Sequence, residues 1–146
     1  MKKIIIILLV ICSNSLSWAQ PPRGERLTPA EFRAKQEAFI TQKAGLTKED
    51  AAKFFPVYFE MQNEKKALND NSWNLIKKGK DPATTEAQYE NIIETTLDNR
   101  IRVDEIEKEY YKQFRKILSA KQLYKVQHAE MRFHRELLKG VNKKKK

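Results

Sequence analysis

Apolar residues recur at steps of three and four along most of this chain, the spacing that gathers them on one side of an α-helix. The clearest example lies between residues 86 and 117, at Tyr89, Ile92, Ile93, Val103, Ile106, Tyr110 and Phe114. A shorter one follows at Leu123, Val126, Phe133 and Leu137, interrupted by Glu130. The alternation typical of a β-strand is not found. The pattern predicts an all-α protein of four helices, at about 29–44, 48–78, 86–117 and 120–139.

A short motif stands where three of these helices are expected to begin: leucine, serine or threonine, two residues, then an acid or amide. Its first copy is Leu27–Glu31, and the other two are defined by Leu46, Thr47 and Asp50 and by Leu118, Ser119 and Gln122. The hydroxyl caps the free N–H groups of the first turn, and a Glu or Gln at the third position reaches back to the cap. Residues 85–88 form a further capping box, whereas Asp50 is too short to close its box well. Each cap is worth about 1 kcal/mol, so the motifs determine where helices begin.

Glycine and proline predict where the helices end or bend. Gly45, Gly79 and Gly140 each follow a helical stretch, where a left-handed closing residue is favoured. Pro56 falls inside the second helix, where proline removes a hydrogen bond and costs about 3 kcal/mol. We expect one continuous helix kinked at Pro56, and a short helix ending near Phe54 is the alternative.

The two long predicted helices give the molecule its expected shape. Each is roughly 45 Å long, so together they would form a thin, elongated hairpin that buries little surface alone and dimerises. The second helix opens with an aromatic-rich cluster too wide for one helical stripe, namely Phe54, Phe55, Tyr58, Phe59 and Met61. Either the whole cluster is core, or part of it meets another chain or a client protein. Charged residues near Arg100 thin the apolar stripe of the third helix, which indicates either a polar groove or simple exposure.

The N-terminal residues have the layout of a secretory signal peptide. A basic start at residues 1–3 precedes eight apolar residues, Ile4–Ile11, and small residues that suit cleavage before Gln20. The apolar run is too short to span a membrane, for which about 20 residues are needed. A retained anchor and a lipoprotein beginning at Cys12 are weaker alternatives, the latter because Ile11 is not small. The predicted organisation is a signal peptide at 1–19, an extended leader at 20–27, a helical domain at 28–140 and a basic, disordered tail at 141–146.

The charge of the chain favours anionic partners. Cleavage would lower the count of Lys and Arg from 29 to 27 against 19 acids, leaving a net charge of +8. Such a protein attracts acidic proteins, anionic surfaces or nucleic acid, and export disfavours nucleic acid. The run Lys143–Lys146 is interpreted as a solvated tail, with docking on anionic membrane headgroups as the alternative.

Nothing in the sequence indicates an enzyme, a cofactor or a metal. The only cysteine, Cys12, lies in the predicted signal peptide. His128 and His134 stand six residues apart, which places them about 120° apart on a helix rather than on one face. Phosphate-binding and hydrolase motifs do not occur, and the pair Glu105 and Glu109 is expected on a solvated face.

With its capped helix starts, basic charge and predicted export, the chain resembles the Spy/CpxP family of periplasmic proteins with L-T-x-x-Q motifs. The matching segments are Leu118–Gln122, with Ser for Thr, and Leu46–Asp50, with Asp for Gln. A subgroup of that family is similar at Phe54–Tyr58, an F-x-P-x-Y segment. The resemblance covers roughly residues 46–138.

The resemblance implies a periplasmic, cradle-shaped antiparallel dimer of kinked helical hairpins. It implies either an ATP-independent chaperone for unfolded envelope proteins, or a regulatory module that binds a membrane stress sensor or anti-sigma system. A metal-sensing role is put in doubt by Asp50 and by the lack of a His-rich segment. The candidate client-binding residues combine aromatic and basic side chains: Phe55, Phe59, Arg100, Arg102, Arg115, Lys116 and Arg132.

Overall fold

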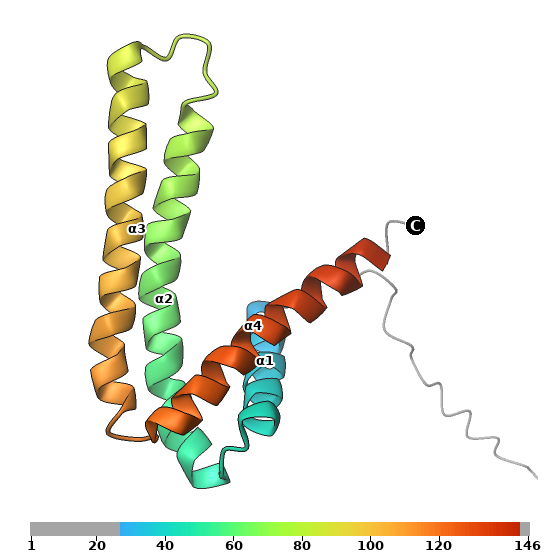
Figure 1. Cartoon of the computed structure of the whole chain (residues 1–146). Helices are drawn as coiled ribbons and strands as arrows, with labels where there is room; N and C mark the ends of the chain where they lie inside the picture. Colours follow the sequence, from blue (N-terminus) through green and yellow to red (C-terminus); the bar gives the residue numbers. More distant parts are fainter. Residues whose placement is uncertain (1–26, 144–146) are drawn as a thin grey trace, which may run out of the picture.

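The computed structural model describes residues 27–143, which form four α-helices and no strand (Figure 1). The helices are α1 at Pro29–Ala44, α2 at Lys48–Lys78, α3 at Glu86–Phe114 and α4 at Ala120–Lys143. The predicted all-α class is confirmed. The predicted signal peptide, most of the predicted leader and the last three lysines lie outside the described residues. Within residues 27–143, no helix has both the length and the apolar composition needed to cross a membrane.

The helix starts follow the predicted capping motifs. Thr28 Oγ1 accepts a hydrogen bond from the Glu31 backbone N–H at 3.2 Å, and the Glu31 carboxylate accepts one from the Thr28 N–H at 2.8 Å. These bonds to Thr28 lower the pKa of Glu31. Ser119 and Gln122 make the same pair of bonds, at 3.2 and 2.9 Å. The motifs therefore act as caps, as their sequence predicts.

The second motif departs from this pattern in an informative way. Thr47 Oγ1 accepts from the Asp50 N–H at 3.0 Å, as a cap should. The Asp50 carboxylate accepts a hydrogen bond from the Gln122 side-chain amide, with 3.2 Å between Nε2 and Oδ2. The starts of α2 and α4, 72 residues apart in sequence, are joined by this bond.

Gly45 and Gly79 both end helices as predicted, Gly79 in a conformation other than the predicted one, whereas the predicted helix end at Gly140 is wrong. Gly45 has φ 67° and closes α1 in the left-handed conformation. Gly79 has φ −64° and is right-handed, so it does not serve as a left-handed cap. A Cβ at Gly79 would lie 3.1 Å from Ile92 Cδ1, so the missing side chain allows α3 to approach closely. Gly140 lies within α4, which runs on into the segment predicted as a tail; an interior glycine costs about 1 kcal/mol without stopping a helix.

The end of α3 is also earlier than predicted. The helix stops at Phe114, and residues 115–117 form a tightened turn in which the Ile117 N–H bonds the Phe114 carbonyl at 3.0 Å. The turn brings Leu118, 2% exposed, into the core.

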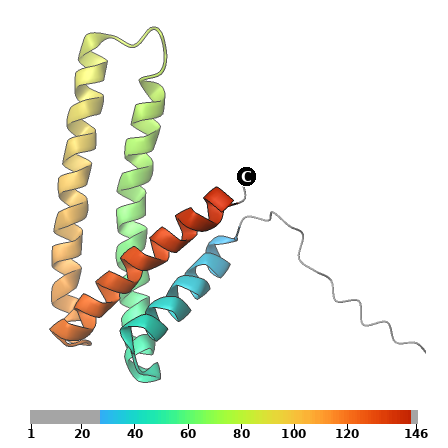
Figure 2. The same cartoon turned by 45° about the vertical axis from the view of Figure 1, so that its right-hand side comes forward.

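The helices pack as two pairs, α2 with α3 and α1 with α4 (Figures 1 and 2). The α1–α4 pair lies beside one end of the α2–α3 pair, and the rest of α2 and α3 stands clear of it in both views. No residue between 62 and 105 is buried, whereas all the buried residues of the described chain lie outside that range. We call residues 62–105 the arm and the remaining described residues the base.

The core of the base contains most of the aromatic cluster of α2. Phe54, Phe55, Tyr58 and Met61 are buried, and the Phe54 ring lies 4.9 Å from that of Phe114 between centroids. Phe59 is half-buried against this core. Helix α2 is continuous through Pro56, so the alternative of a short helix ending near Phe54 is wrong. The kink itself stays a prediction.

Candidate functional site

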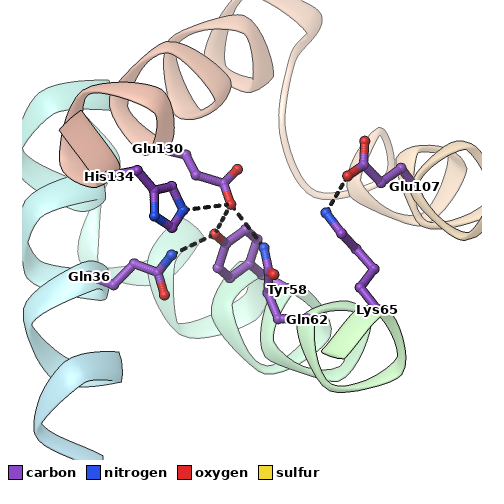
Figure 3. Close-up of polar contacts among 7 residues, drawn as sticks. All are labelled: Gln36, Tyr58, Gln62, Lys65, Glu107, Glu130 and His134. Carbon is purple, nitrogen blue, oxygen red and sulfur yellow. Dashed lines mark hydrogen bonds and ion pairs between the residues drawn. The ribbon is translucent and has the colours of Figure 1, made fainter. Parts of the chain in front are cut away.

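A groove of about 500 Å³ lies in the base, at its border with the arm, between α2, the last turns of α3, and α4. Its lining includes the buried rings of Phe54, Tyr58 and Phe114 and the more exposed side chains of Tyr111, Tyr124 and Met131. Lys65 and Glu107, which form an ion pair between α2 and α3, also line it (Figure 3). The groove is therefore largely apolar with a few polar groups, the usual character of a binding cleft.

A hydrogen-bond network joins three helices at this groove (Figure 3). The Tyr58 hydroxyl of α2 donates to Glu130 Oε1 of α4 at 2.7 Å. The Gln36 amide of α1 donates to the same hydroxyl at 3.0 Å, and Gln62 of α2 donates to Glu130 Oε1 at 2.9 Å. Glu130, the polar interruption in the apolar stripe of α4, thus has its partners on α2.

The electrostatics of the network keep Tyr58 neutral. Burial raises the pKa of Tyr58 well above its ordinary value, and the charge of Glu130 and its hydrogen bond raise it further. Tyr58 is therefore a fixed donor rather than a base. His134 Nε2 lies 4.0 Å from Glu130 Oε1. Since every described contact of Glu130 uses Oε1, its second carboxylate oxygen can accept from a ligand beside the groove.

A second candidate surface lies on the arm. Trp73 and Ile76 of α2 and Ile93 and Leu97 of α3 are all exposed, from 44% for Ile76 to 71% for Trp73. Each directly follows a half-buried residue that faces the other helix, for example Ser72 or Ile92. One residue turns a helix by about 100°, and in an antiparallel pair this turn points to the same side on both helices. We call these four side chains the apolar face.

Register places one predicted client-binding residue beside the apolar face. Asn99 faces α2, where its side-chain amide donates to Asn71 Oδ1 and Ser72 Oγ, each at 3.0 Å. Arg100 directly follows Asn99 and is exposed, so it falls on the same side as Leu97. Arg102 is two residues further, about 200° round the helix, and pairs with Glu105 and Glu109.

The other predicted client-binding residues do not share one surface. Phe55 is 2% exposed and packs in the core, so it presents no contact surface. The Arg33 guanidinium lies 5.5 Å from the centroid of the Phe59 ring. Arg115 donates to the Leu118 carbonyl at 3.0 Å, a structural contact beside Lys116 at the turn. Arg132 lies on α4 and pairs with Glu136.

The apolar face was missed at the sequence level, although a signal for it exists. Ile92 and Ile93 are adjacent apolar residues where a single stripe requires one, and Trp73 and Ile76 follow the inward positions of α2. Adjacent apolar residues on a helix indicate a second face.

Within residues 27–143, no cluster of three or more His, Cys, Asp or Glu side chains is placed to bind a metal ion. The polar groups of the groove can orient a bound polypeptide, and the apolar side chains can hold it.

Comparison with models of known protein families, with curated proteins and with solved structures found no match to this chain. The resemblance to the Spy/CpxP family stays a prediction based on the motifs.

Proposed function

We propose that this protein is an exported, chaperone-like protein that binds unfolded envelope proteins without ATP, and that the apolar face is its contact surface. The observation that supports this proposal is the position of Trp73, Ile76, Ile93 and Leu97 on one side of the arm, where all four stay exposed among residues 27–143. Contiguous exposed apolar side chains typically mark interaction sites.

Charge and apolar contact have different roles in this proposal. The positive charge attracts acidic clients at long range, and Arg100 places a cation beside the apolar face. Attraction between exposed charges fades beyond about 8 Å at physiological salt. Capture should therefore slow as salt rises, while apolar holding persists.

The proposal includes an antiparallel dimer of hairpins kinked at Pro56. It is supported by the thinness of the arm, in which no residue is buried, and by the position of Pro56 inside α2. Sedimentation equilibrium at micromolar concentration tests this part, and a purely monomeric helical species would remove it. A dimer that covers the apolar face would compete with client binding, so added client should then dissociate it.

The test is light scattering of a denatured acidic client diluted into buffer with the protein, across a salt series. The triple variant Trp73→Gln, Ile93→Gln and Leu97→Gln should lose most of the protection, because each apolar contact is worth about 1.5 kcal/mol, or tenfold in affinity. The control variant is Tyr111→Gln with Tyr124→Gln, which alters exposed rings at the groove instead. Circular dichroism should show both variants folded. Equal protection by the triple variant and the wild type would reject the apolar face as the contact surface.

The second candidate function, a regulatory module for one membrane partner, is favoured by the groove. Its fixed Tyr58–Glu130 pair and second Glu130 oxygen could recognise one defined peptide. A crosslinking pull-down that captures one stoichiometric membrane protein would support this function, if the Tyr111→Gln, Tyr124→Gln variant no longer captures it and the triple variant still does. If the wild type also gives no protection of the client at any salt concentration, the regulatory function would replace the chaperone proposal.

A further inference from the structure

A row of basic side chains runs along the solvent side of α4. Its exposed members are Lys121, Lys125, His128, Arg132, Arg135 and Lys139, and we call them the basic stripe. At 100° per residue they fall within an arc of about 80°, and the row is about 27 Å long at 1.5 Å per residue. The stripe is therefore straight and narrow, unlike the scattered cations of the arm.

The charge of the basic stripe is little compensated. Among the described residues of α4, Glu136 is the one exposed acid, and it pairs with Arg132 at 3.0 Å. Among the described residues, Lys121, Lys125, Arg135 and Lys139 make no ion pair. The sequence continues the positive charge with the run Lys143–Lys146.

Two exposed apolar side chains border the stripe. Tyr124 and Met131 stand seven residues apart, so they lie on one side of α4 and next to the row of cations. Basic residues with a tyrosine and an apolar neighbour are typical of helices that lie on a membrane surface. The opposite side of α4 is buried through Val126, Ala129 and Phe133, so the helix is fixed and can contact a bilayer only at its surface.

We infer that the basic stripe binds the phosphate headgroups of an anionic lipid bilayer and holds the protein against the membrane surface. A straight row of basic side chains about 27 Å long matches the planar array of anions at a bilayer surface. Tyr124 and Met131 suit the boundary between headgroups and acyl chains. The apolar face lies on the other pair of helices and shares no residue with the basic stripe. This site is independent of the proposed function.

The experiment is co-sedimentation of the purified protein with vesicles of phosphatidylglycerol and phosphatidylcholine, and with vesicles of phosphatidylcholine alone. Each basic residue near an anionic surface contributes about fivefold in affinity. The variant Lys125→Gln, Arg135→Gln and Lys139→Gln should therefore bind anionic vesicles about 100-fold more weakly. The control variant Lys77→Gln, Lys78→Gln and Lys80→Gln removes the same charge from the tip of the arm and should change the affinity less than about fivefold.

Four outcomes would overturn the inference. Wild-type binding to neutral vesicles as strong as to anionic ones would exclude headgroup recognition. Unchanged affinity in the stripe variant, with its fold intact by circular dichroism, would show that the stripe is not the membrane-binding site. Equal losses of affinity in the stripe variant and the control variant would show that vesicle binding depends only on net charge. Binding to soluble polyglutamate without binding to vesicles would assign the stripe to an acidic polypeptide.

Discussion

The base and the arm have the same spacing of apolar residues, but these residues are buried in the base and exposed in the arm. In the base, Phe54, Ile106 and Phe114 are buried because α1 and α4 cover the α2–α3 pair there. In the arm, Ile93 and Leu97 repeat the spacing and remain about half exposed, at 58% and 49%. Hydrophobic periodicity thus shows which side of a helix can be buried, and the presence of a third helix decides whether it is.

Truncating one side chain in each region should give the largest difference in stability. Phe54→Ala should lower the free energy of unfolding by about 3–5 kcal/mol, because it opens a cavity in the core. Ile93→Ala, on the exposed side of the arm, should change it by less than about 0.5 kcal/mol. Urea denaturation of both variants measures the two values. A large cost for Ile93→Ala would mean that the apolar face is covered in the folded protein, as in a dimer.

The polar network should make a smaller contribution to the base. Tyr58→Phe removes the partner of both Gln36 and Glu130 and should cost about 1–3 kcal/mol. Tyr111→Phe is the matched control, since its exposed hydroxyl makes no hydrogen bond within residues 27–143, and its cost should be near zero. Equal denaturation midpoints for the two variants would show that the network does not stabilise the fold.

Alkaline pH should weaken the contact between base and arm. The hydrogen bond from Tyr110 to Glu64 Oε1, 2.6 Å long, raises the pKa of Tyr110 to about 12 from an ordinary value of 10.0, and burial adds to the effect. The folded state favours the neutral phenol, so its contribution is complete below pH 10 and is lost as the pH rises through 12. Near pH 11 the loss should be about 1 kcal/mol. Urea midpoints at pH 9 and 11 test this, and a slope that Tyr110→Phe leaves unchanged would contradict it.

The smallest effect is expected at a helix start. Ser119→Ala removes the acceptor for the Gln122 N–H and should cost about 1 kcal/mol or less. Lys121→Ala, two residues away and exposed, is the control. If the two variants unfold at the same denaturant concentration, the serine bonds are present without adding stability.

Local signals allowed the helices to be predicted, and long-range contacts could not be. The starts at Pro29, Lys48 and Glu86 agree with the sequence because a cap depends on residues three apart. Gly140 was misread because glycine permits a helix end without requiring one, and Gly79 ends α2 without the left-handed conformation that glycine allows. The bond between Tyr58 and Glu130 joins residues 72 apart, and no local pattern indicates such a partner. Phe55 was proposed as a contact residue for the same reason, because its burial depends on helices that its own sequence does not specify.

The bond between Gln122 and Asp50 lies in the base, so the length of the arm can change without breaking it. This bond holds the starts of α2 and α4 together, so the chain between them, which contains all of α2 and α3, forms a closed loop. The entropy cost of such a closure grows only with the logarithm of the enclosed length. Seven residues added to each of α2 and α3 within the arm would lengthen it by about 10 Å and keep the same sides facing each other. The arm is therefore the part of this protein whose length can be changed, in evolution or by design, without repacking its core.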